Sequence, residues 1–434
     1  MKRFGALIFV LLLAVFCAIF SGGCSQNQVT PTNEAFSSPI LQAFDCVNGE
    51  FLYPERLPDK FNSLSGITLE ATLLTDYGSV EGLIKSLADP YTRYVLPGKD
   101  NVDAVLSGSS FAGIGVTMAV KEGKIRLLYV IPDGPAKLAG LQSGDIITKI
   151  NDRVTDGLAT SEVTDLIRGL PDTTVKLEVL RGETTFVFNI TRQYINIKNV
   201  YSEVMAGNIG YVKILQFGYS SAADFTQAYN KVANNCVGLI IDLRGNGGGE
   251  LSNAVSIASS FVPDGQAVMW YKDRWSDARK IAASNGTKIT LPVIVLVDEF
   301  TASAAELLVA SLVDNGLAEA VGTRTYGKGL VQSRYELTDG AHIYLTVAEF
   351  FSPTQQKITG QGINPAVIAA LSDDDFVGGR DSQLASAMIA LASRQRQARA
   401  QTVETCRPLA VQTVSLPAVL EKAVDVPVGD GSIL

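Results

Sequence analysis

The sequence predicts a multidomain protein of mixed α/β and α+β class: a helical N-terminal segment, a β-rich domain and an α/β core. The chain has 434 residues, of which 47% are hydrophobic, so it is too long for one ordinary domain and can bury several cores. Residues 101–193 alternate short β-branched runs with glycine-rich turns. In residues 194–370, continuous apolar strands alternate with helices, which is typical of a largely parallel sheet covered on both faces.

The first 24 residues are predicted to be a signal peptide. Two basic residues precede an apolar run at 6–20, which is shorter than the roughly 20 residues needed to span a bilayer. Cys24 follows small residues, as at a bacterial lipoprotein processing site, although Ser21 stands where that site usually has leucine. We therefore expect export to the bacterial cell envelope (periplasmic or extracytoplasmic), with membrane attachment through lipidated Cys24 or, alternatively, plain secretion.

Two segments follow the signal. Residues 25–39 are rich in Ser, Thr, Asn, Gln and Pro and are predicted to be a flexible tether. Residues 40–100 are predicted to be a mainly helical segment. Within it, one helix is expected from Thr68 to Leu87, ending before Pro90 because proline cannot continue a helix.

The remaining elements follow from the hydrophobic pattern. In residues 101–193 we predict strands at 125–131, 145–150, 175–179 and 186–190 and a helix at 161–168. In residues 194–370 we predict strands at 209–215, 237–243 and 292–297, with helices at 222–233, 251–261 and 303–315. Residues 371–434 are predicted to be a C-terminal extension, helical around 380–400.

Histidine and cysteine content excludes several chemistries. His342 is the one histidine, so a zinc site built from several histidines is excluded, and no cysteine spacing suits a metal. His342 lies in a strand-like run and is expected to be a packed or edge residue, which disfavours Ser-His-Asp and Cys-His catalysis. Cys236 is expected to be buried, and whether Cys46 and Cys406 pair is left open.

The charge pattern disfavours nucleic acid as a partner. The chain carries 36 basic and 44 acidic residues, a net charge of -8, with no block of basic residues. We also predict no cofactor and no metal.

Lys328 is the candidate base. A serine nucleophile without histidine needs another base, and lysine is the usual substitute once it is buried away from carboxylates. Lys328 lies between two glycines, is followed by Leu330 and Val331, and has no acid closer along the chain after it than Glu336. Gln332 is placed to hold the amine through its side-chain carbonyl. A lysine in a glycine turn is also typical of a protein surface, so this segment alone does not decide its role.

Ser303 is the candidate nucleophile. It follows a buried-type strand and opens a helix, so it lies at the carboxyl end of a parallel strand, where ligands gather. The N–H groups and dipole of a helix N-terminus stabilise a developing oxyanion. A helix-capping serine suits the same position, and that structural alternative stays open.

A glycine turn lies at the end of another predicted strand. Residues 242–249 read Asp-Leu-Arg-Gly-Asn-Gly-Gly-Gly, in which glycines let backbone N–H groups approach a reacting carbonyl. The segment lacks the GxxxxGK[ST] pattern and the GxGxxG spacing of phosphate loops. We therefore prefer a role in binding an oxyanion or a substrate strand.

Together these motifs resemble the C-terminal processing (tail-specific) peptidase family. Residues 301–306, Thr-Ala-Ser-Ala-Ala-Glu, resemble its nucleophile motif, and residues 325–332, Thr-Tyr-Gly-Lys-Gly-Leu-Val-Gln, resemble its lysine motif. The resemblance implies a crotonase/ClpP-like α/β peptidase core. It also implies that Ser303 is the nucleophile, Lys328 the general base and Gln332 the residue that orients this base.

The glycine turn resembles the family's Asp-Leu-Arg-x-Asn-Pro-Gly-Gly sequence, with Gly247 in place of the proline. We expect this departure to loosen the turn. For the oxyanion hole that the resemblance implies, we predict the N–H groups of Gly248 and Ala304 as donors.

Residues 101–193 resemble a PDZ domain. The sequence Phe-Ala-Gly-Ile-Gly at 111–115 resembles its carboxylate-binding loop, and residues 135–151 resemble much of the rest. The resemblance implies that backbone N–H groups hold a free C-terminal carboxylate while the ligand adds as a strand. The predicted groove is formed by Gly113, Ile114, Gly115, Val116, Val163 and Ile167.

The sequence therefore predicts an exported serine endopeptidase that docks free, apolar C-termini of protein substrates and cleaves through an acyl-enzyme. The alternatives are an envelope PDZ adaptor or chaperone without proteolysis, and a crotonase-like acyl enzyme, which the absence of an acyl-thioester signature disfavours. An adaptor partner and a homo-oligomer built by residues 40–65 and 371–434 stay open. The apolar residues 432–434 are themselves a candidate ligand for the PDZ groove.

Overall fold

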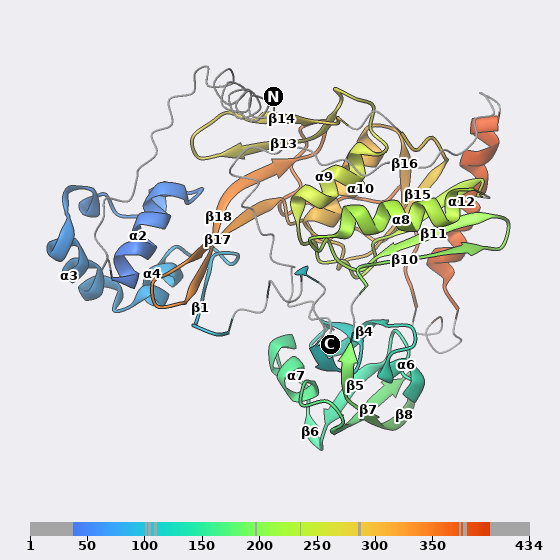
Figure 1. Ribbon diagram of the computed structural model, residues 1–434, viewed down its shortest axis with the longest axis horizontal. Coiled ribbons are helices and arrows are strands. Elements are labelled where there is room, and N and C mark those ends of the chain that lie inside the picture. Colours follow the sequence, from blue (N-terminus) through green and yellow to red (C-terminus); the bar gives the residue numbers. More distant parts are fainter. Residues whose placement is uncertain are drawn as a thin grey trace, which may run out of the picture. The chain divides into compact units, whose positions relative to one another are not determined.

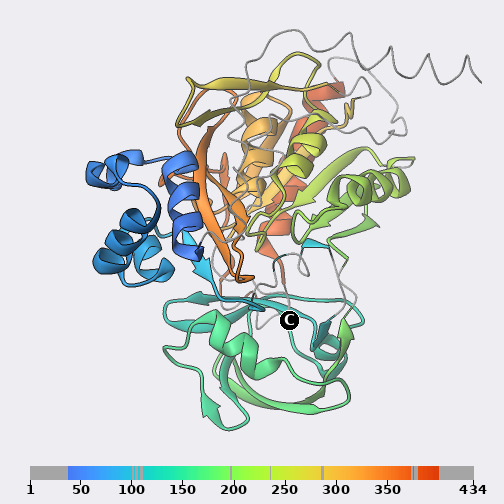
Figure 2. The same ribbon diagram turned by 60° about the vertical axis from the view of Figure 1, so that its left-hand side comes forward.

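The computed structural model describes residues 38–99, 102, 106–107, 111–195, 198–234, 236–284, 288–372, 375 and 380–399. The predicted signal peptide and its Cys24, together with Cys406 and residues 432–434, lie outside this part of the chain. The described residues form a helical segment, a β-rich domain and an α/β core (Figure 1 and Figure 2). Among them, no helix has the length and apolar character to cross a membrane.

The helical segment contains more breaks than we predicted. It consists of α2 (Pro39–Glu50), two 3₁₀ turns (Pro54–Arg56 and Asp59–Ser63), α3 (Gly66–Tyr77) and α4 (Val80–Ser86). The prediction of one helix from Thr68 to Leu87 was wrong, because Gly78 adopts φ +74° and ends α3. Ser79 then caps α4, since its Oγ accepts a hydrogen bond from the N–H of Gly82.

The β-rich domain is built on an antiparallel sheet in the order β3-β4-β5-β7-β8, with β6 paired to β5. Its elements are β3 (Val116–Lys121), β4 (Lys124–Val130), α6 (Pro135–Ala139), β5 (Ile146–Ile150), β6 (Arg153–Val154), α7 (Thr160–Ile167), β7 (Thr174–Arg181) and β8 (Thr184–Thr191). A separate pair joins β2 (Phe111–Gly113) to β9 (Gln193–Ile195). The predicted strands and helix of this domain are confirmed, and β3 lies at the edge of the sheet.

The core contains a six-stranded sheet in the order β10-β11-β12-β15-β16-β19. Its strands are β10 (Val200–Met205), β11 (Ile209–Ile214), β12 (Gly238–Asp242), β15 (Val293–Val297), β16 (Ala318–Gly322) and β19 (Val367–Ile368). Only the pairing of β10 with β11 is antiparallel. The prediction of a largely parallel sheet is therefore confirmed.

Helices cover both faces of this sheet, as predicted. Residues of α8 (Ser221–Ala233), α9 (Leu251–Ser259) and α10 (Ala304–Asp314) share one hydrophobic cluster with one face of the strands (Figure 1). The opposite face packs against α12 (Ser382–Arg399), where Ala387 and Leu391 share a cluster with Ile240 and Leu296. Part of the predicted C-terminal extension therefore packs directly on the core sheet.

A second, antiparallel sheet was not foreseen from the sequence. It joins β1 (Arg93–Val95), β18 (His342–Phe351), β13 (Ala267–Asp273) and β14 (Arg279–Ala282), with β17 (Leu330–Glu336) also paired to β18. Lys328 directly precedes β17 and Gln332 lies within it, so this sheet positions the predicted base and its partner.

Candidate active site

Ser303 lies between β15 and α10, at the carboxyl end of the parallel sheet. It is fully buried, and its backbone has φ +59° and ψ -120°, which non-glycine residues rarely adopt. Among the described residues, its Oγ has no hydrogen-bond partner. Ser303 is the N-cap residue of α10, and its N–H donates to Glu306 as in one half of a capping box, but its hydroxyl makes no capping hydrogen bond. A strained backbone and a buried, unpartnered hydroxyl are instead typical of a nucleophile on a strand-to-helix turn.

Glu306, to which the sequence analysis gave no role, joins the serine segment to the lysine segment. Its fully buried Oε2 accepts hydrogen bonds from the N–H groups of Ser303 (2.9 Å) and Lys328 (2.8 Å). Oε1 accepts from the N–H of Gly327 (2.7 Å) and the hydroxyl of Thr325 (2.5 Å). Burial raises the pKa of Glu306, and these donors oppose the rise without cancelling it. The Ser-x-x-Glu spacing at a helix start is the signal that could have identified this residue.

Lys328 and Gln332 are both buried. Lys328 is 1% exposed, and its Nζ lies 5.4 Å from the ring centroid of Tyr91. Burial raises the pKa of the Tyr91 hydroxyl to about 12, so this ring stays neutral at physiological pH. The Nε2 of Gln332 donates to Thr346 Oγ1 (3.2 Å), while its Oε1 has no partner among the described residues. Within the described part of the chain, Ser303 and Gln332 therefore each present a buried polar atom without a hydrogen bond.

The glycine turn lies directly against the nucleophile. Asn246 anchors it: its Nδ2 donates to the C=O of Ile214 (2.9 Å), and its own C=O accepts from the N–H of Ala302 (2.9 Å). A Cβ on Gly248 would lie 2.8 Å from the Cβ of Ser303, so only glycine fits there. The turn and the serine segment are thus packed without space for an added methyl group.

The two predicted oxyanion donors, the N–H groups of Gly248 and Ala304, differ in their hydrogen bonding. The N–H of Gly248 donates to Asn246 Oδ1 (2.9 Å), so it is engaged within its own turn rather than directed at a substrate. Ala304 is the first residue of α10, where N–H groups have no intrahelical acceptor. Among the described residues, the N–H of Ala304 makes no backbone hydrogen bond outside the helix. This geometry favours Ala304 over Gly248 as the donor.

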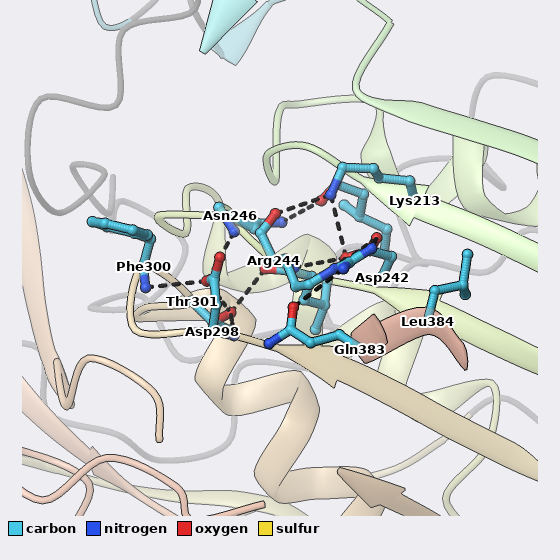
Figure 3. A network of polar contacts seen from close by, with 12 residues as sticks. Lys213, Asp242, Arg244, Asn246, Asp298, Phe300, Thr301, Gln383 and Leu384 are labelled. Carbon is cyan, nitrogen blue, oxygen red and sulfur yellow. Dashed lines mark hydrogen bonds and ion pairs between the residues drawn. The ribbon is translucent and has the colours of Figure 1, made fainter. Parts of the chain in front are cut away.

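Asp298 is a second residue that the sequence analysis missed. Its Oδ1 accepts from the N–H groups of Gly245 (2.9 Å) and Phe300 (3.1 Å) and from the hydroxyl of Thr301 (3.1 Å). Burial raises its pKa. Figure 3 shows that these contacts join the glycine turn to the loop that precedes Ser303. These contacts anchor the turn, in which Gly247 stands where the family has proline.

The predicted carboxylate-binding loop leads into β3. The C=O groups of Ile114 and Gly115 accept from the N–H groups of Ala136 (2.8 Å) and Ile131 (2.9 Å). Within the described part of the chain, the N–H groups of Ile114 and Gly115 make no backbone hydrogen bond outside strands. Gly113 instead pairs with Gln193 in the β2–β9 ribbon. Two of the three predicted N–H donors therefore have no backbone partner of this kind, although both residues are buried.

The predicted apolar groove residues do not lie open on the surface. Val116, Val163 and Ile167 are fully buried and belong to the hydrophobic core of the domain, together with Ile114. Their burial follows from the packing of α7 directly on the sheet. The loop and the first residues of β3 are also buried, so the structure shows no open groove at these positions.

The residues predicted to have no catalytic role lie outside this site. His342 begins β18 opposite Val95 and Glu336, is 9% exposed, and its Nε2 lies 2.9 Å from the Nη2 of Arg334. Its prediction as a packed residue is confirmed, as is that of Cys236, which is 6% exposed. Across the described ranges, no group of three or more His, Cys, Asp or Glu side chains could hold a metal ion.

Comparison with known proteins identifies the class of this fold and site. The model of peptidase family S41 matches residues 208–369, and that of the PDZ domain matches residues 127–181. The fold and the site thus define a serine peptidase that carries a PDZ domain. More narrowly, the chain belongs to the carboxyl-terminal processing proteases of family S41.

Similar proteins support this assignment across most of the chain. The carboxy-terminal processing protease CtpA of Bacillus subtilis is 36% identical over 383 residues, which cover 86% of this chain and 79% of that protein. The carboxyl-terminal-processing protease of Synechocystis is 29% identical, with 84% and 87% covered. The solved structure of the photosystem II D1 C-terminal processing protease has a TM-score of 0.58 and 26% identity, covering 79% of this chain and 97% of that one.

Proposed function

We propose that this peptidase is exported and cleaves protein substrates with a Ser303–Lys328 dyad after its PDZ domain has docked their free, apolar C-termini. The observation that carries the dyad is the contact through Glu306. One buried carboxylate holds the backbone N–H of the strained Ser303 and that of the buried Lys328 at 2.9 and 2.8 Å. The two side chains therefore come from segments that are fixed to each other.

The proposed reaction proceeds through an acyl-enzyme. Ser303 Oγ attacks the carbonyl carbon of the scissile bond while the neutral amine of Lys328 accepts the hydroxyl proton. The N–H of Ala304 stabilises the resulting oxyanion. Lys328 then donates the proton to the leaving amine, the C–N bond breaks, and a water activated by the same lysine hydrolyses the ester. Gln332 Oε1, which lacks a partner among the described residues, accepts a hydrogen bond from the lysine amine and orients it.

Docking and export are supported more indirectly. The N–H groups of Ile114 and Gly115 and the edge strand β3 suit a carboxylate and an added strand. Export and lipidation at Cys24 rest on the sequence of residues 1–24. Membership of a protease family favours proteolysis over the adaptor or chaperone alternative.

The test uses the purified chain and an unfolded protein with an apolar C-terminus, prepared with that terminus free or amidated. Cleavage is followed from pH 6 to 10 for the wild type, Ser303→Ala and Lys328→Ala. We expect each variant to lose at least about 1,000-fold in kcat while circular dichroism shows a folded protein. Amidation is expected to raise KM about tenfold, because it removes a charge-assisted hydrogen bond whose free energy corresponds to about that factor.

Each part of the proposal fails on a different result. Unchanged cleavage by Ser303→Ala or by Lys328→Ala would show that the Ser303–Lys328 dyad is not the catalytic pair. Equal KM values for the free and amidated substrates remove carboxylate docking but leave the dyad intact.

A further inference from the structure

A network of polar and charged side chains connects the glycine turn to residues just before and within α12. Arg244, in the turn, donates to the side chains of Asp242, Asp381 and Gln383. Figure 3 shows it beside Asp242 and Gln383. Its Nε and Nη2 donate to Asp242 (3.1 and 2.6 Å), and its Nη1 and Nη2 donate to Asp381 (2.9 and 2.8 Å). Nη1 also donates to Gln383 Oε1 (3.2 Å). The Arg244 side chain is 13% exposed and that of Asp242 is 1% exposed, so little water reaches these charges.

The same arginine fixes the backbone at the start of the turn. Its N–H donates to Asp242 Oδ1 (2.9 Å), and its C=O accepts from the Nζ of Lys213 on β11 (2.9 Å). The next N–H in the chain, that of Gly245, donates to Asp298, which also holds the loop before Ser303. A displacement of Arg244 would therefore move both segments that build the site.

Asp381 and Gln383 are themselves held firmly. Asp381 Oδ1 accepts from the N–H of Leu384 (2.8 Å), so this carboxylate caps the first turn of α12 while it pairs with Arg244. Gln383 is 2% exposed, and its Nε2 donates to the C=O of Ala369 (2.7 Å), just after β19. Both of these side chains, which accept from Arg244, are therefore held in place. Asp381 is bound to the first turn of α12, and Gln383 to the backbone just after β19.

Apolar contacts also hold α12 on the sheet. Ala387, Ala390 and Leu391 already pack in a hydrophobic cluster with Ile240 and Ile294. The Asp381 side chain is 36% exposed, so its ion pair with Arg244 adds little to stability. Precise placement of the turn is a role that this pair can fill instead.

We propose that Asp381 and Gln383 are positioning residues for the peptidase reaction. They hold Arg244, and through it residues 244–249 and 298–302, in the arrangement that hydrolysis needs. The inference rests on the proposed function, which places the oxyanion site beside this turn. It gives Asp381 and Gln383 a role in placing the active site that needs no contact with the substrate.

Asp381→Asn is a sharp probe, because asparagine caps a helix as well as aspartate does but removes the charge that faces Arg244. Glu319→Gln is its matched control. Glu319 on β16 pairs with Arg394 near the other end of α12 (2.9 Å), and both carboxylate side chains are 36% exposed. Each variant removes one carboxylate charge from an ion pair at one end of α12, and only Asp381 pairs with the turn.

The experiment measures kcat and KM for a quenched fluorescent peptide, and thermal unfolding, for the wild type, both variants and Asp381→Glu. Because misplacing a reacting group by about 1 Å can cost about 100-fold in rate, we expect Asp381→Asn to lower kcat about tenfold with KM changed less than about twofold. Asp381→Glu, which keeps the charge, should recover most of the rate. Glu319→Gln should leave kcat unchanged at a similar melting temperature.

Equal kcat values for Asp381→Asn and Glu319→Gln would overturn the inference, as would a change confined to KM. Ser303→Ala is measured in parallel to separate this result from a failure of the proposed function. If Ser303→Ala still cleaves, the proposed function is wrong and the role given to the turn falls with it. If Ser303→Ala is inactive, the comparison of Asp381 with Glu319 decides the inference alone.

Discussion

At the scale of single residues, the site depends on a carboxylate that does no chemistry in the proposed reaction. Glu306 has four donors around two oxygens, and they come from two segments that are separated by about 20 positions in the chain. The sequence could select Ser303 and Lys328 as candidates, because a serine at a helix start and a lysine between glycines match known motifs. The role of Glu306 was not, because it depends on which segment folds against it.

Glu306→Gln tests this role. Glutamine has nearly the same shape, but its NH₂ group replaces one of the two oxygens of Glu306. Each oxygen accepts two hydrogen bonds, so two buried donors lose their acceptor. We expect the free energy of unfolding to fall by about 1–3 kcal/mol, and kcat to fall at least about tenfold as Ser303 and Lys328 move apart. Chemical denaturation and steady-state kinetics measure the two effects. Glu319→Gln serves as the control, and wild-type kcat in Glu306→Gln would contradict the role.

At the scale of elements, the parallel strands were the most predictable part of the fold. Buried central strands such as β12 and β15 are continuous apolar runs, and the sequence shows this directly. The helix predicted across Gly78 failed because a single glycine in the left-handed region outweighed the surrounding helical pattern. The antiparallel sheet containing β13, β17 and β18 was missed because its strands pair across long stretches of chain.

Gly248→Ala tests the packing of the glycine turn on α10. The new Cβ would lie 2.8 Å from the Cβ of Ser303, and φ +109° is unfavourable for alanine. We expect kcat to fall at least about 100-fold, because the clash displaces the nucleophile. Gly265→Ala is the matched control: it also has positive φ, +80°, but its added Cβ meets nothing within 4 Å. Both variants should lose stability by about 1–3 kcal/mol.

Only Gly248→Ala should lose activity. If Gly265→Ala loses as much activity as Gly248→Ala, backbone strain rather than contact with Ser303 explains the effect.

At the scale of the whole molecule, the site is assembled from segments that are distant in sequence. The glycine turn follows β12, Ser303 follows β15, Lys328 precedes β17, and Asp381 precedes α12. Motif spacing could predict the first three segments. It could not predict the contact of Arg244 with Asp381, because these residues are 137 positions apart and nothing local marks them as partners.

The central claim is that Ser303 is the nucleophile and Lys328 its base. The most direct measurement is mass spectrometry of the protein after brief reaction with a slowly hydrolysed peptide ester and acid quenching. The account predicts one added acyl group, located on Ser303 in the wild type, absent in Ser303→Ala and accumulating far more slowly in Lys328→Ala. An acyl group on another residue, or equal acylation of Ser303 in Lys328→Ala, would contradict it.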